Sequence, residues 1–67
     1  KTGDLRRADG EYTAYLRAQP QDADILEKRG KLRLKMNYKD KACADFRAAV
    51  KNGSTTAGDW IPRACYK

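Results

Sequence analysis

The chain is 67 residues long, carries a formal net charge of +6 at pH 7 and contains no histidine. A chain of this length forms one small domain, and about 60% of its unfolded surface can be buried on folding. The absence of histidine removes the commonest general base and the commonest zinc ligand, and two cysteines alone cannot make a structural zinc site. We therefore expect residues 1–67 to form a single domain without a metal or cofactor.

The first predicted helix covers about residues 4–18. Its apolar side chains recur at helical spacing on one face, which is formed by Leu5, Ala8, Tyr12, Tyr15 and Leu16. The pair Gln19-Pro20 ends this helix, because the residue before a proline avoids the helical region. Asp22 is a suitable N-cap for the helix that follows.

The second predicted helix runs from Ile25 to Met36 and has two apolar stripes. Ile25, Leu32 and Met36 form one stripe, and Leu26, Gly30 and Leu34 form the other. The polar strip between them consists of Asp24, Glu27, Lys28, Lys31 and Lys35. Gly30 costs up to about 1 kcal/mol relative to alanine inside a helix, so we expect a facing helix to approach it closely.

The third predicted helix covers about residues 39–51, and a short last helix covers about 59–66. Ala42, Phe46 and Ala49 form a small-large-small ridge on the third helix that can seat Gly30. Asn52-Gly53 ends this helix, since glycine adopts the left-handed conformation without a Cβ penalty. No apolar run approaches the roughly 20 residues that a membrane span needs.

The central stretch, residues 22–53, resembles a tetratricopeptide repeat. Leu26, Gly30, Ala42, Phe46 and Ala49 stand at the offsets of the family's large and small residues. The pair Arg29-Gly30 and the run Ala44-Asp45-Phe46 look like common family variants. Two positions depart from the pattern: Ser54 replaces the usual proline, and Arg33 replaces a usual aromatic residue.

The same landmarks recur along the chain at the family's period of 34 residues. This spacing relates Ala8 to Ala42, Tyr12 to Phe46, Pro20 to Ser54, Leu26 to Trp60, and Gly30 to Ala64. The resemblance therefore covers about one and a half to two repeats. It implies an all-α fold in which antiparallel helical hairpins stack as a right-handed superhelix, an α-solenoid fragment.

Such arrays normally need about three units for stability. We therefore expect the chain to belong to a longer array, or to cover its first helix by self-association. A fragment whose ends have no biological meaning is the alternative.

In tetratricopeptide arrays the polar strip lines a concave groove that holds peptides. The resemblance implies a non-catalytic protein-interaction module or scaffold, and the cationic groove favours an acidic peptide as its partner. The candidate partner-binding residues are Glu27, Lys28, Lys31, Leu34 and Lys35. The alternatives are a solvated charged face, a spacer within a larger protein, or a nucleic-acid-binding surface. Nucleic acid is the weakest of these, because helix packing already accounts for Tyr12, Tyr15 and Phe46.

Catalysis is not expected, because the sequence contains neither a glycine-rich phosphate loop nor a nucleophile with a neighbouring base. The carboxylate pairs Asp9/Glu11 and Asp22/Asp24 are two residues apart and do not face each other on a helix. We expect them to face solvent or to cap helices. Asp45 is expected to form an ion pair with a basic neighbour on the helix surface.

Cys43 and Cys65 would lie on neighbouring helices in this family, which implies that a disulfide can form if their Cα atoms come within about 7 Å. Such a bond would contribute roughly 3 kcal/mol and would indicate an oxidising compartment, such as the periplasm or the cell exterior. Two buried thiols acting as small apolar residues are the alternative, and they would fit the cytoplasm.

Overall fold

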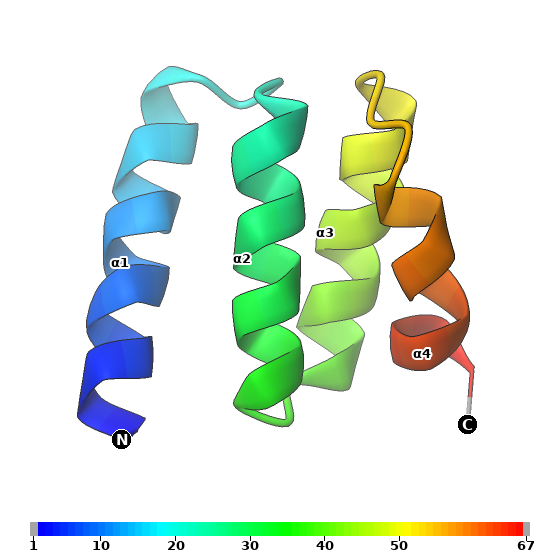
Figure 1. Ribbon diagram of the computed structural model, residues 1–67. Coiled ribbons are helices and arrows are strands. Elements are labelled where there is room, and N and C mark those ends of the chain that lie inside the picture. Colours follow the sequence, from blue (N-terminus) through cyan, green and yellow to red (C-terminus); the bar gives the residue numbers. More distant parts are fainter. Residues whose placement is uncertain (1, 67) are drawn as a thin grey trace.

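The computed structural model describes residues 2–66 as a row of antiparallel helices (Figure 1). The elements are α1 (Thr2–Ala18), α2 (Ala23–Lys35), α3 (Lys39–Lys51), the 3₁₀ turn η1 (Ala57–Trp60) and α4 (Ile61–Cys65). The described residues contain no strand, which confirms the all-α class. The last predicted helix is in fact divided between η1 and α4.

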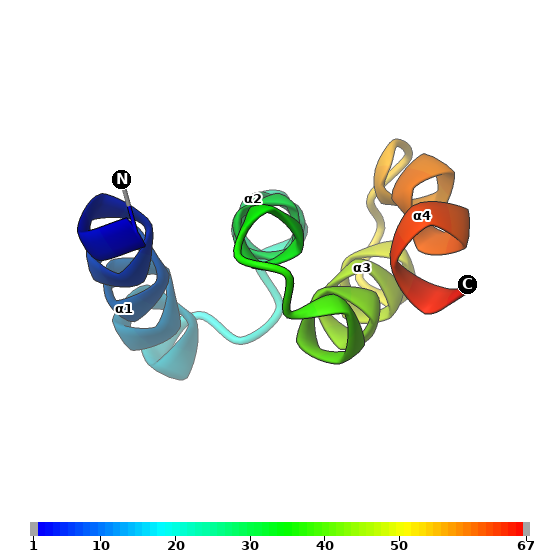
Figure 2. The same cartoon turned by 90° about the horizontal axis from the view of Figure 1, so that it is seen from below.

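The helices form a thin slab with extents of 30 × 28 × 15 Å. Viewed along the helix axes, α2 is displaced from the line between α1 and α3, toward the side on which α4 lies (Figure 2). Within residues 2–66, no helix is both long and apolar enough to cross a membrane.

Asp22 begins α2 and also ties it to the preceding helix. Its carboxylate accepts a hydrogen bond from the Ile25 amide at 3.2 Å, so the predicted N-cap is confirmed. The same carboxylate accepts a hydrogen bond from the Tyr15 hydroxyl at 2.7 Å. This bond raises the pKa of Tyr15 and lowers the pKa of Asp22. The expected burial of Tyr15 is wrong, because the residue is 45% exposed and turns toward this cap.

The centre of the core is the contact between Gly30 of α2 and Phe46 of α3. Both residues are buried, and a Cβ placed on Gly30 would lie 2.7 Å from Cε1 of the Phe46 ring. The expected close approach at Gly30 is therefore present. On its other side Phe46 stacks on Trp60, with ring centroids 5.7 Å apart and an interplanar angle of 17°. Leu16, Leu26, Ala42, Ala49, Ala57 and Ala64 complete the buried cluster.

Two aromatic residues at the 34-residue spacing have different environments. Phe46 is fully buried, because α2 covers one side of it and Trp60 covers another. Tyr12 is only partly buried, and so is Ala8, the counterpart of Ala42. Among the described elements, α1 packs chiefly on α2, which explains why side chains of α1 are less covered.

A buried polar network joins the first three helices on the side of α2 that carries Arg29 and Arg33. Arg29 donates to both carboxylate oxygens of Asp45, at 2.9 and 2.7 Å, and to the Thr13 hydroxyl at 3.2 Å. Arg33 lies 3.3 Å from Asp45 and donates to Asp9 at 3.0 Å. The expected ion pair of Asp45 with a basic neighbour is confirmed, but its expected place on the helix surface and the expected exposure of Asp9 are corrected. Asp45 is buried between helices instead of pairing on the surface, and Asp9 forms an inter-helix ion pair instead of facing solvent.

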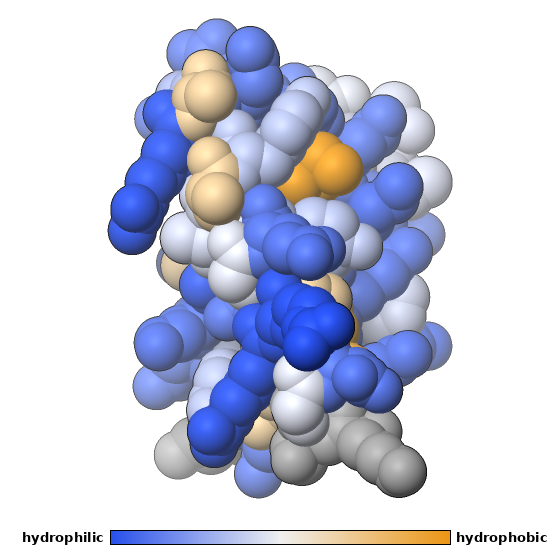
Figure 3. Space-filling model, turned by 90° about the vertical axis from the view of Figure 1, so that its left-hand side faces the viewer, coloured by the Kyte–Doolittle hydropathy of each residue, from blue (hydrophilic) through white to orange (hydrophobic). Residues whose placement is uncertain are grey.

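The outer face of α1 is predominantly hydrophilic (Figure 3). The less exposed positions of this helix follow one stripe, Leu5, Ala8, Asp9, Tyr12, Thr13 and Leu16, and the opposite positions are exposed. Since α1 packs on α2, the apolar stripe is largely used within the chain. Self-association through α1 stays a prediction. The polar outer face of α1 offers little apolar surface for such a contact.

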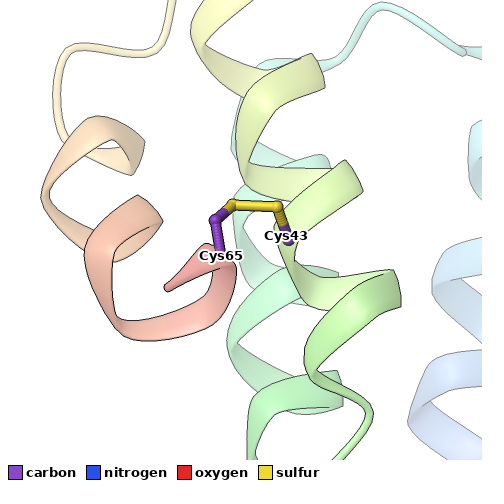
Figure 4. The surroundings of a disulfide bond; sticks show 2 residues. All are labelled: Cys43 and Cys65. Atoms are coloured by element: carbon purple, nitrogen blue, oxygen red, sulfur yellow. A yellow bond between two sulfur atoms is a disulfide. The ribbon is translucent and has the colours of Figure 1, made fainter. Parts of the chain in front are cut away.

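Cys43 of α3 and Cys65 of α4 form a disulfide (Figure 4). Their Cα atoms are 4.9 Å apart, and 22 positions separate them in the sequence. In the chain-entropy model, closing a loop of this length stabilises the fold by about 3 kcal/mol. The bond fixes α4, which has only five residues, against α3.

Candidate partner-binding groove

Three lysines follow one edge of α2, on the side where the surface is hollowed. Lys28 and Lys35 are exposed, and the Lys31 side chain is 43% exposed. Lys31 lies about 200° around the helix from Arg29, so the lysines face away from the buried polar network. Among the described residues, Lys31 takes part in an ion pair, whereas Lys28 and Lys35 do not.

The first hollow lies between α2 and η1. It has a volume of about 460 Å³ and is lined by Lys31, Leu34, Lys35 and Trp60. The Lys31 ammonium is 5.1 Å from the Trp60 ring centroid, and the Arg63 guanidinium carbon is 5.0 Å from it. Leu34 and the indole therefore give the hollow an apolar floor beside two lysines, and Arg63 lies next to the same indole.

A second hollow lies on the other side of the same lysines, between α2 and α1. It has a volume of about 190 Å³ and is lined by Tyr12, Lys28, Lys31, Leu32 and Lys35. Both hollows share Lys31 and Lys35. We call the two together the lysine groove. It crosses α2 and offers apolar contact on both sides of a row of positive charges.

Glu27 does not belong to the exposed strip, so its prediction as a partner contact is corrected. The residue is only 7% exposed. Its carboxylate accepts hydrogen bonds from the Thr56 hydroxyl at 2.7 and 2.9 Å and from the Ser54 hydroxyl at 3.1 Å. It also lies 3.5 Å from the Lys31 ammonium. These contacts, the Thr56 bond first, lower the pKa of Glu27 and keep it charged.

The role of Glu27 is to hold the loop before η1 against α2. Ser54, which Glu27 binds, also accepts hydrogen bonds from the backbone amides of Thr56 and Ala57. The loop is thereby fixed at the point where it turns toward Trp60. Glu27 thus positions one wall of the groove and contributes no surface for a partner.

The structure brings the other four predicted contact residues together. Lys28, Lys31, Leu34 and Lys35 all line the lysine groove. From the sequence, Trp60 was placed at a large-residue position of the repeat, and neither Trp60 nor Arg63 was among the predicted contact residues. One signal was present: Arg63 follows Trp60 by three residues, a spacing that places two side chains on the same face of a helix.

The chemistry that this surface supports is recognition of negative charge next to apolar groups. Ammonium and guanidinium groups donate to carboxylates or phosphates, and the aromatic and leucine side chains accept apolar contact. Among the described residues, no group of three or more His, Cys, Asp or Glu side chains is arranged to hold a metal ion.

Comparisons with protein-family models, with curated proteins and with solved structures find no match for this chain.

Proposed function

We propose that the chain is a non-catalytic protein-interaction module that binds an acidic peptide in the lysine groove. The observation that carries this proposal is the placement of Lys31 and Lys35 between two apolar hollows. A peptide with alternating acidic and apolar side chains could place its carboxylates on the lysines and its apolar groups on Leu34 and Trp60.

The preorganised framework supports this proposal energetically. The residues of the first hollow stand on α2 and η1, whose relative position is fixed by the Gly30–Phe46 contact and by the Phe46–Trp60 stack. A peptide would therefore bind without ordering the groove first, which reduces the entropic cost of association. The net charge of +6 would also attract an acidic partner at low salt.

We propose in addition that the hairpins are arranged as in a tetratricopeptide array. The antiparallel order of α1, α2 and α3 supports this (Figure 1), as does the displacement of α2 and α4 to one side of the slab (Figure 2). In that arrangement α2 and α4 would line the concave face. The lysine groove, which includes Trp60 next to α4, would then open on that face.

The proposal is tested with a fluorescently labelled probe peptide in which leucine and glutamate alternate. Binding to the whole chain is measured by fluorescence anisotropy at low and at physiological salt. The variant carries Lys31→Gln and Lys35→Glu. Lys31 is neutralised instead of reversed, because a carboxylate at that position would face Glu27. Losing two surface charge contacts of about 0.5–1 kcal/mol each lowers the affinity about tenfold.

The matched control makes the same charge changes on α3, with Lys51→Gln and Lys39→Glu. Both lysines are exposed and neither lines the groove. The control should bind the probe peptide almost as well as the natural chain. Equal affinities for the groove variant and the α3 variant would refute the proposal. A short single-stranded RNA that displaces the peptide and binds more tightly would reassign the surface to nucleic acid.

A further inference from the structure

One wall of the lysine groove stands on a segment that is too short to hold its own conformation. η1 and α4 together cover residues 57–65, and they supply Trp60 and Arg63. Isolated helices shorter than about 12–15 residues are marginal in water, so this segment depends on its contacts with the rest of the chain.

The segment is attached to the slab at three places. At its start, Glu27 binds the hydroxyls of Ser54 and Thr56. In its middle, Trp60 stacks on Phe46. At its end, a disulfide links Cys65 to α3 (Figure 4). The fully buried side chains of the segment are the small ones of Ala57 and Ala64, and Trp60 and Ile61 are partly buried against the core, so the segment depends on these few contacts and on the three attachments.

Of the three attachments, only the disulfide can be broken and restored by a chemical reaction. We propose that the Cys43–Cys65 bond gates the lysine groove: the oxidised chain holds Trp60 in place, and reduction by a dithiol releases η1 and α4. This inference rests on the proposed function, since it concerns the regulation of the same groove. We expect α1, α2 and α3 to stay together in the reduced state, because the polar network does not involve the segment and Gly30 still meets Phe46 after the ring has lost its stack on Trp60.

The reaction is an ordinary thiol–disulfide exchange. A thiolate of the dithiol attacks the sulfur of Cys65, forms a mixed disulfide and displaces the thiolate of Cys43. The second thiol of the dithiol then attacks the dithiol's first sulfur, which is bonded to Cys65 in the mixed disulfide, and displaces the thiolate of Cys65. Two electrons pass from the dithiol to the cysteines, the dithiol becomes a cyclic disulfide, and its two protons end on the cysteine thiols.

The first measurement needs no ligand, because Trp60 is the only tryptophan of the chain. Quenching of its fluorescence by acrylamide is compared between the oxidised chain and the variant Cys43→Ala/Cys65→Ala. The variant contains neither a thiol nor a disulfide that could itself quench the indole. We expect quenching in the variant to rise toward that of the urea-unfolded chain, while helicity by far-UV circular dichroism falls only by the contribution of α4. Dithiothreitol should increase quenching in the natural chain and leave the double variant unchanged.

The second measurement is the affinity for the leucine–glutamate probe peptide before and after treatment with dithiothreitol. If the released segment is docked about one tenth of the time, the apparent Kd rises about tenfold on reduction. The double variant should bind as weakly as the reduced chain at every concentration of dithiothreitol.

The possible results separate the two proposals. Unchanged quenching on reduction would overturn the gate, and tight peptide binding by the oxidised chain would still support the proposed function. Increased quenching with unchanged affinity would also overturn the gate. Increased quenching together with no binding in either state would support release of the segment but refute the proposed function. Increased quenching with weakened binding supports both.

Discussion

The substitution Gly30→Ala tests the close contact between α2 and α3 more directly than any other change. Inside a helix, replacing glycine by alanine normally stabilises by up to about 1 kcal/mol. At this position the added Cβ would lie 2.7, 2.9 and 3.0 Å from three carbons of the Phe46 ring. The ring cannot easily retreat, because it is 0% exposed and stacks on Trp60.

The expected result is a net loss of stability. Inserting a methyl group into a well-packed core costs about 1–3 kcal/mol. This cost is larger than the gain in helix propensity, which is at most about 1 kcal/mol. We therefore expect Gly30→Ala to lower the free energy of unfolding by about 1 kcal/mol. For a domain of this size, that corresponds to a fall in Tm of about 4–8 °C.

The matched control is Gly10→Ala in α1. Gly10 also lies inside a helix, but nothing lies within 4 Å of the position of its added Cβ. This substitution should stabilise the chain by up to about 1 kcal/mol. The difference between the two variants cancels the helix propensity and leaves the cost of the contact with Phe46, about 1–3 kcal/mol.

Urea unfolding followed by circular dichroism gives these free energies. A double variant, Gly30→Ala with Phe46→Leu, provides a second check, because a leucine leaves more room for the added methyl group. We expect Gly30→Ala to be less costly in that background, which a double-mutant cycle would reveal as coupling. Equal stabilities for Gly30→Ala and Gly10→Ala would show that the ring yields freely, and the packing described for α2 and α3 would be wrong.

Three further predictions concern the charged groups. Asp45→Asn should lower the free energy of unfolding, measured by urea unfolding, by about 3 kcal/mol, because two arginines lose their buried charged partner. The control Asp40→Asn, at an exposed position, should change this free energy by less than about 0.5 kcal/mol. Similar losses for both variants would contradict the polar network. The folded pKa of Glu27 lies below its ordinary value of 4.5. The stability that ionised Glu27 contributes is therefore complete above pH 4.5 and is lost as the pH falls through the folded pKa. Glu27→Gln should accordingly make the fall of stability with decreasing pH less steep. An unchanged pH profile would argue against the loop contacts. Asp22→Ala should return the raised pKa of Tyr15 toward its ordinary value of 10.0, as measured by absorbance at alkaline pH, and a pKa that stays raised would exclude their hydrogen bond.

The local pattern of residues was sufficient to predict the three long helices and the close contact between α2 and α3. The spacing of apolar residues predicted three helices close to their observed bounds, and the cost of glycine inside a helix pointed to the approach at Gly30. Both signals depend on residues a few positions apart. The antiparallel order was expected only from the resemblance to tetratricopeptide repeats.

The features that the sequence did not reveal depend on residues distant along the chain. Glu27 has the helical position of an exposed residue, and its burial arises only because the loop at Ser54 and Thr56 folds over it. The partners of Asp45 likewise stand on another helix, 16 positions away for Arg29. Periodicity identifies the face on which such a side chain lies, but it does not identify the group that will meet it there.

The bonds made by Arg29 have a geometric consequence. Apolar contact is non-directional, so two helices held by it alone can rotate and slide against each other at little cost. The planar guanidinium donates to Thr13 of α1 and makes two hydrogen bonds to Asp45 of α3, and these directional bonds restrict the angles at which the helices can pack. Arg29 therefore restrains the tilt of α1 and α3 about α2, and we expect its exchange for lysine to loosen that tilt without altering any residue of the lysine groove.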